Sequence, residues 1–95
     1  MVTKEMDKLQ TAVAFWTWFL ATDEELIREL TQLYLDRNLT PYQIKRMFKE
    51  EVEKSEDKEI VESDEFWREL TDSLHRIVVK RIYEVIKDDL RFISD

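Results

Sequence analysis

Residues 64–92 read DEFWRELTDSLHRIVVKRIYEVIKDDLRF, and this stretch decides the fold. It contains neither glycine nor proline, and apolar side chains recur every three or four positions, which places them on one face of an α-helix. Ser63 stands immediately before it and has a hydroxyl suited to capping the first free amides. The sequence therefore predicts one long helix over residues 64–92. The apolar stripe of its first half consists of Phe66, Trp67, Leu70, Leu74, Ile77 and Val78.

The second half of this helix carries a further apolar series on a different side. Its members are spaced by 4, 3, 4 and 3 residues, which is the pattern of a coiled-coil seam. Together with the first stripe they make about half of the circumference apolar, which is more than one small domain readily covers. We therefore expect a second copy of the chain to cover this series. It consists of Val79, Tyr83, Ile86, Leu90 and Ile93.

The rest of the chain also favours helices. No glycine and a single proline occur in 95 residues, whereas glycine averages about 7% of protein sequences. Glycine serves tight turns and phosphate-binding loops, so the usual hairpins and dinucleotide-binding motifs are excluded. The sequence predicts an all-α fold in one domain, residues 1–95, because this length suits a single core.

Three shorter helices are predicted ahead of the long one, over residues 3–21, 23–37 and 41–53. Thr22 and Thr40 each stand three residues before a Glu or Gln, which is the pattern of a capping box. Asn38 is expected to end the second helix, because asparagine tolerates the left-handed conformation. Residues 53–63 carry mostly charge, so we expect an acidic linker there, with a helical turn at residues 57–62.

The first helix is expected to be central in the core, since its last three turns are apolar almost all round. Trp18 lies about 60° outside the main apolar arc. We expect a partner chain to share Trp18, because tryptophan is enriched at interface hot spots. The main arc consists of Met6, Leu9, Ala12, Val13, Phe15, Trp16, Phe19 and Leu20.

The formal net charge of −7 falls almost entirely on one stretch. Residues 49–65 contribute −6, residues 1–48 contribute −1 and residues 66–95 contribute 0. Such a run is most often a solvated linker, yet it also suits docking on a basic partner. The stretch Glu50–Glu65 therefore supports one alternative hypothesis, an acidic inhibitor of a basic nucleic-acid-binding protein.

The segment Thr31–Glu50 resembles the helix-turn-helix motif of DNA-binding proteins. Its apolar residues fall at the contact positions of the motif, and Asn38 stands where the motif usually has glycine. Tyr34 and Arg37 depart from the pattern, because the motif has a small residue and an apolar residue there. The resemblance implies a DNA-binding transcriptional regulator with residues 40–49 as recognition helix. The side chains that would meet DNA are Thr40, Tyr42, Gln43, Lys45, Arg46 and Lys49.

No catalytic, cofactor or metal site is predicted. His75 is the only histidine, and with Asp72 it offers two ligands where a metal centre needs more. The chain has no cysteine, which excludes thiolate and disulfide chemistry. The longest apolar run, residues 12–21 interrupted by Thr17, is about half of the ~20 residues that a membrane span needs. We therefore expect a cytoplasmic protein that is not an enzyme and does not enter a membrane.

These features favour a small non-enzymatic interaction or regulatory module that works as a homodimer through its first helix and the second half of its last helix. A DNA-binding regulator and an acidic inhibitor stay as alternatives. The expected dimer interface consists of Trp18, Val79, Tyr83, Ile86, Leu90 and Ile93.

Overall fold

Five helices form the computed structural model, which describes the backbone of residues 4–55 and 58–94 and the side chains of residues 8–55 and 58–87. No strand occurs in the described ranges, so the predicted all-α class with a long C-terminal helix is confirmed. The sequence analysis expected a linker at residues 53–63, but the described parts of this segment, residues 53–55 and 58–63, are largely helical. The helices are α1 (Lys4–Ala21), α2 (Glu24–Leu35), α3 (Pro41–Ser55), α4 (Lys58–Val61) and α5 (Asp64–Ser94).

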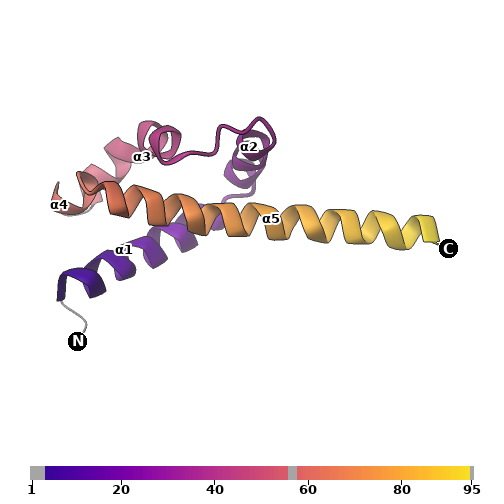
Figure 1. Cartoon of the computed structure of the whole chain (residues 1–95), viewed down its shortest axis with the longest axis horizontal. Coiled ribbons are helices and arrows are strands. Elements are labelled where there is room, and N and C mark those ends of the chain that lie inside the picture. Colours follow the sequence, from indigo (N-terminus) through magenta and orange to yellow (C-terminus); the bar gives the residue numbers. More distant parts are fainter. Residues whose placement is uncertain (1–3, 56–57, 95) are drawn as a thin grey trace.

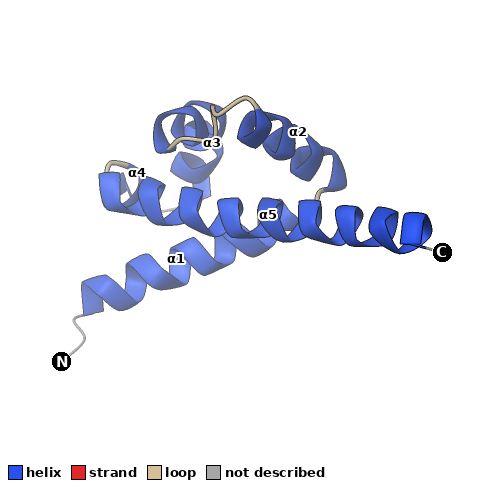
Figure 2. Ribbon diagram, turned by 45° about the vertical axis from the view of Figure 1, so that its right-hand side comes forward, coloured by secondary structure: helices blue, strands red, loops and turns tan. Residues whose placement is uncertain are grey.

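The other helices pack on α5. Figures 1 and 2 show α1 along one side of α5, with α2 and α3 on the opposite side, and each of them contacts it. The first half of α5 buries the predicted stripe, in which Phe66, Leu70 and Leu74 are fully inaccessible to solvent. Ile77, predicted in the same stripe, is only partly buried. The shorter helices complete the core with Ala12, Val13, Trp16, Leu20, Ile27, Leu30, Ile44, Phe48 and Val52.

The short helix α4 lies at one end of the core, in contact with α3 and α5. Its apolar pair, Ile60 and Val61, is buried, while Lys58 is exposed. The indole Nε1 of Trp67 on α5 donates a hydrogen bond of 2.6 Å to the carbonyl oxygen of Val61. The described end of the acidic stretch is therefore held against the core by apolar burial and by a buried hydrogen bond.

The N-terminus of α2 differs from the prediction by one residue. Asp23, and not Thr22, is the N-cap. The Asp23 Oδ1 accepts hydrogen bonds from the backbone N–H groups of Glu25 at 3.1 Å and Leu26 at 3.3 Å. Thr22 donates its hydroxyl to the carbonyl oxygen of Phe19 at 2.7 Å, at the end of α1. The prediction for Thr22 was wrong because the Asp23 carboxylate serves two amides and leaves the threonine hydroxyl to α1.

The other two predicted N-caps are confirmed. The hydroxyl of Thr40 accepts the backbone N–H of Gln43 at 3.2 Å. The hydroxyl of Ser63 accepts the backbone N–H of Phe66 at 3.3 Å. Each bond satisfies one of the amides that the first turn of a helix leaves without an intrahelical partner, so α3 and α5 begin where the sequence predicts.

The C-terminus of α2 has a left-handed residue, but this is Arg37, with φ 63°, and not the predicted Asn38. The Arg37 N–H donates to the Tyr34 carbonyl at 3.0 Å. The Asn38 N–H donates to the Leu33 carbonyl at 2.8 Å, which completes a Schellman motif. Because α2 ends at Leu35, two residues before the predicted end, Arg37 takes the left-handed position.

Replacing Arg37 by glycine removes the crowding between its Cβ and the following carbonyl. We expect Arg37→Gly to raise the free energy of unfolding by about 0.5–1 kcal/mol, because part of the gain is offset by the larger freedom of glycine in the unfolded chain. Urea unfolding followed by circular dichroism measures the change. The control is Asp36→Gly, which should lower stability because Asp36 has an ordinary φ of −82°. A loss of stability in both variants would contradict the account of this turn.

Two buried tryptophans allow a test of how much the hydrogen bond that holds α4 contributes to the free energy of unfolding. Trp67 donates its indole N–H to Val61, whereas the Trp16 Nε1 has no hydrogen-bond partner in the described structure. We expect Trp67→Phe to cost about 1–3 kcal/mol more than Trp16→Phe, because only the first change leaves a buried carbonyl unpaired. Both changes remove the same volume, so the difference between the two unfolding free energies isolates the bond. Equal losses would mean that packing alone holds α4.

Candidate interaction surfaces

The last part of α5 extends beyond the other helices (Figure 1). Residues 83–94 are referred to here as the arm, and every side chain described in it, from Tyr83 to Lys87, is exposed. The radius of gyration is 15.4 Å, whereas a compact chain of this length has roughly 12–13 Å. The 31 residues of α5 thus produce a helix longer than the core that surrounds it.

The apolar stripe of α5 continues into the arm, beyond the point to which the other helices cover it. Val78 is 0% exposed, Ile82 is partly buried, and Val85, one helical turn further on, is 54% exposed. The spacing of these three residues keeps them on neighbouring positions of one helix face. Val85 is therefore exposed because no other helix reaches this part of α5, and not because it points away from the direction of the core.

Exposed large apolar side chains on α1 and α5 are the first candidate site, and we name this set of residues the apolar surface. Trp18 and Tyr83 are its most exposed members, at 65% and 64%. The sequence analysis placed Phe15 and Phe19 in the buried arc of α1, but they are 46% and 47% exposed, since α5 and α2 cover the other side of α1. The surface consists of Phe15, Trp18, Phe19, Val79, Tyr83, Val85 and Ile86.

The predicted dimer interface overlaps this surface. Four of its residues are exposed on it, and the side chains of Leu90 and Ile93 lie outside the described residues. Sequence reasoning missed Phe15, Phe19 and Val85, because helical spacing shows which residues share a face but not how far a neighbouring helix covers that face. The four exposed residues are Trp18, Val79, Tyr83 and Ile86.

The aromatic side chains of α1 are held in a cluster. The ring centroids of Phe15 and Phe19 lie 6.1 Å apart in a stacked arrangement, and each ring meets the buried Trp16 edge to face at 5.5 Å. Such pairs add about 0.5–1.5 kcal/mol each beyond the burial of area. The exposed rings are thus positioned before any partner binds, which lowers the entropic cost of binding.

A charge-assisted contact fixes α2 to α5 immediately before the arm. One guanidinium nitrogen of Arg81 donates to both carboxylate oxygens of Glu24, at 2.6 and 2.7 Å. Both side chains are largely exposed, so this pair adds only about 0–1 kcal/mol to stability. Its structural effect is that the corner between α1 and α2 lies beside the start of the arm.

The solvent-facing side of α3 is the second candidate site. Ile44, Phe48 and Val52 are buried toward α5, and the opposite stripe of the helix is exposed. We name this stripe the α3 face. It consists of Tyr42, Arg46, Lys49, Glu50 and Glu53.

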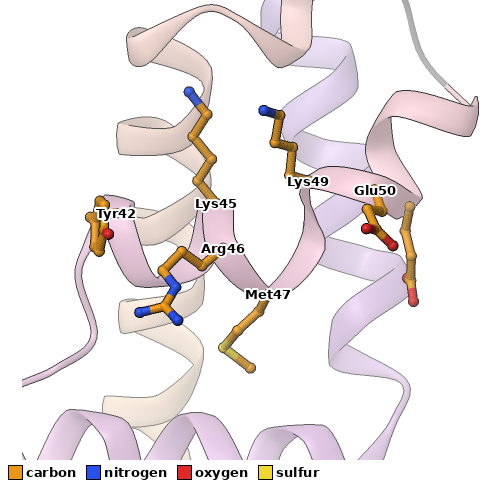
Figure 3. A pocket seen from close by; sticks show the side chains of 7 residues that line it. Tyr42, Lys45, Arg46, Met47, Lys49 and Glu50 are labelled. Atoms are coloured by element: carbon orange, nitrogen blue, oxygen red, sulfur yellow. The ribbon is translucent and has the colours of Figure 1, made fainter.

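The side chains around the α3 face line an open cavity of about 580 Å³ (Figure 3). The guanidinium carbon of Arg46 lies 5.9 Å from the ring centroid of Tyr42, a cation–π distance. Lys49, at the edge of this face, extends together with Lys45 and away from Arg46. Met47 is partly buried at the edge of the core. The cavity is completed by Glu50 and Glu51.

The predicted DNA-contacting residues are grouped by the structure on or beside α3. Tyr42, Arg46 and Lys49 are exposed, Gln43 and Lys45 are partly buried, and the exposed Thr40 caps the helix. The close contact between two helices that characterises a helix-turn-helix is weak here, because α2 and α3 each pack on α5 and make few contacts with each other.

Tyr34 contacts α5. It occupies the position where the helix-turn-helix motif has a small residue, and its ring lies edge to face against His75 of α5, at 4.8 Å. The Tyr34 ring therefore packs between α2 and α5. DNA binding by residues 40–49 stays a prediction.

The acidic stretch 50–65 is distributed over three helices in its described part. Glu50, Glu51 and Glu53 are exposed on α3, Glu62 follows α4, and Glu65 belongs to the first turn of α5. Residues 56 and 57 lie outside the described ranges. The inhibitor hypothesis stays a prediction.

Known chemistry and known relatives add no further site. Among residues 8–55 and 58–87, no group of three or more His, Asp or Glu side chains is placed to hold a metal ion. None of the helices in the described part combines the length and apolar content needed to cross a bilayer. No protein-family model, curated protein or solved structure matches the chain.

Proposed function

We propose that this protein is a small non-enzymatic interaction module that works as a homodimer, with the apolar surface as its dimer interface. Two observations carry the proposal: the α5 stripe continues beyond its cover, and α1 has an exposed aromatic cluster. Val85 and Tyr83 on the arm, together with Trp18 and Phe15 on α1, leave this protein with apolar area that its own helices do not cover.

The size of the uncovered area favours a partner of comparable size. At about 150–250 Å² for a whole aromatic side chain, Phe15, Trp18, Phe19 and Tyr83 together expose roughly 330–560 Å². Val79, Val85 and Ile86 add to this area. The total over these residues approaches the ~800 Å² that each partner buries in a standard protein interface.

Covering this surface would remove apolar area from water. Two copies that bury these aromatic side chains remove roughly 700–1,100 Å². Removal of apolar area from water is the dominant favourable contribution to most protein–protein association.

A second copy fits this surface better than a different partner. Twofold symmetry lets one patch cover the same patch on another molecule, so no new complementary surface is required. The heptad-like spacing of Val79, Tyr83 and Ile86 is the pattern by which helices of identical chains pair. The same pairing also brings Trp18 and its neighbours on α1 close to the partner, because α1 packs along α5.

A charge placed in the apolar surface should prevent dimerisation. We expect Tyr83→Glu to reduce the solution mass from twice 11.6 kDa to 11.6 kDa at tens of micromolar protein, because the dimer would bury an unpaired carboxylate. Sedimentation equilibrium measures the mass. The unfolding free energy of the monomer should change by no more than about 0.5 kcal/mol, since Tyr83 is exposed.

The matched control is Leu35→Glu. Leu35 is 61% exposed, almost as much as Tyr83, but lies at the end of α2 outside the apolar surface. We expect the Leu35→Glu variant to remain a dimer. A parent chain that stays monomeric at these concentrations, or a Tyr83→Glu variant that associates as well as the parent, overturns the proposal.

A further inference from the structure

A second open cavity lies between the start of α3 and the start of α5. Its volume is about 360 Å³, which falls within the range of roughly 300–1,000 Å³ that small-molecule sites occupy. It is distinct from the cavity of Figure 3, although both cavities include Tyr42 and Lys45 in their walls. The residues that line the second cavity are Pro41, Tyr42, Lys45, Asp64, Trp67 and Arg68.

Two cations from different helices meet in this second cavity. Lys45 belongs to α3 and is partly buried, whereas Arg68 belongs to α5 and is exposed. Neither forms an ion pair within the part of the chain whose side chains are described. Arg68 is unpaired although Asp64 and Asp72 each stand four residues away on α5, a spacing that allows ion pairs. Both cations are therefore available to an anion from outside the molecule.

Part of the cavity wall is apolar and fixed in place. Trp67 is 1% exposed, and its indole N–H donates to the Val61 carbonyl. Its ring also meets the ring of Phe66 edge to face at 4.9 Å. Pro41, with its closed ring, has little freedom of its own. Little of this wall has to be ordered when a ligand binds, which lowers the entropic cost of binding.

Tyr42 supplies an exposed aromatic ring to the same cavity. The residue is 71% exposed, and the Arg46 guanidinium carbon lies 5.9 Å from the ring centroid. Arg46 lines the cavity of Figure 3 but not the second cavity. The cation–π contact therefore positions the ring from one side and leaves the side toward the second cavity open to a flat ligand.

We propose that the second cavity binds a small organic anion that combines a single phosphate or carboxylate with a flat ring. Lys45 and Arg68 hold the anionic group, and the planar guanidinium of Arg68 suits both kinds because it donates two parallel hydrogen bonds. The ring of the ligand stacks on Tyr42, as nucleobases stack on aromatic side chains. A nucleoside monophosphate and an aryl carboxylate both have this chemistry.

A nucleic-acid strand suits this region less well than a small anion. The strand presents a row of phosphates, and those beyond the second cavity would be repelled by Glu50 and Glu51, which line the neighbouring cavity. Asp64 also opposes further negative charge inside the second cavity. Two cations with one carboxylate favour a ligand that has one anionic group.

This site goes beyond the proposed function and does not depend on it. No residue that lines the second cavity belongs to the apolar surface. The Tyr83→Glu variant should therefore bind the ligand as tightly as the parent chain does. Failure of the dimer and failure of the ligand site are thus separate results.

Isothermal titration calorimetry with adenosine monophosphate (AMP) and with phenylacetate, at about 0.01 M salt, tests the proposal. We expect one of the two to bind at one site per chain at millimolar concentration or below, and the tighter one identifies the anionic group as phosphate or carboxylate. Compounds that lack one part, namely adenosine and ribose phosphate for AMP, or benzyl alcohol and acetate for phenylacetate, should bind roughly tenfold or more weakly.

Variants assign the binding to the second cavity. Lys45→Gln/Arg68→Gln should weaken binding of the tighter ligand by roughly tenfold or more, because both cations are lost. The matched control, Arg76→Gln/Lys80→Gln, removes the same charge from exposed positions of α5 outside the cavity and should keep binding within about threefold. Tyr42→Phe should bind as the parent does, whereas Tyr42→Ala should bind roughly tenfold more weakly. Circular dichroism should show the helix content of the parent in each variant.

Several results would overturn the proposal. One is that neither AMP nor phenylacetate binds, or that a compound without the ring or without the anion binds as tightly as the complete ligand. Another is that the two double variants weaken binding equally, or that Tyr42→Ala binds as the parent does. Binding of a random-sequence DNA duplex by a parent chain that binds neither small anion would assign these cations to nucleic acid instead.

Discussion

Burial of the α5 stripe is the interaction on which the structure depends. Helices α1, α2 and α3 each pack mainly on α5, and α4 contacts both α3 and α5. Trp67 at one end of the stripe anchors α4, and Arg81 at the other end meets the start of α2. The core therefore exists only where a second helix covers α5, and it ends near Ile82, where that cover ends.

The same constraint produces the exposed surface. A helix of 31 residues is about 46 Å long, which approaches the 52 Å length of the whole molecule. The remaining helices have 18, 12, 15 and 4 residues and surround only part of it. Exposure of Val85 is thus a consequence of helix length and not of an irregular sequence. Tyr83 lies on the side of α5 on which Val79 is also exposed. The α3 face has a different origin. Its charged side chains lie on a helix whose buried apolar side packs on α5.

Features set by neighbouring residues could be predicted from the sequence. The spacing of Phe66, Leu70 and Leu74 fixed one face of α5, and the hydroxyls of Thr40 and Ser63 placed the starts of two helices. Features that depend on competition between neighbouring residues were harder to predict from the sequence. Asp23 displaced Thr22 as a cap because both were suited to that role, and the earlier end of α2 moved the left-handed residue to Arg37.

The candidate sites show the same division. The sequence correctly indicated excess apolar area on α5, but exposure of Phe15 and Phe19 depends on which side of α1 meets α5, and helical spacing alone does not contain that information. Tyr34 is a further example, because its edge-to-face contact with His75 of α5 depends on how α2 packs on α5.

Amide hydrogen exchange of α5 at several protein concentrations tests the central claim most directly. If the arm is covered only by a second copy, the amides of residues 83–87 should exchange rapidly in dilute protein and more slowly as the concentration rises. The amides of residues 66–78, which the molecule covers by itself, should keep the same protection throughout. Protection of the arm that is independent of protein concentration would contradict the claim that only a second copy covers its apolar side chains.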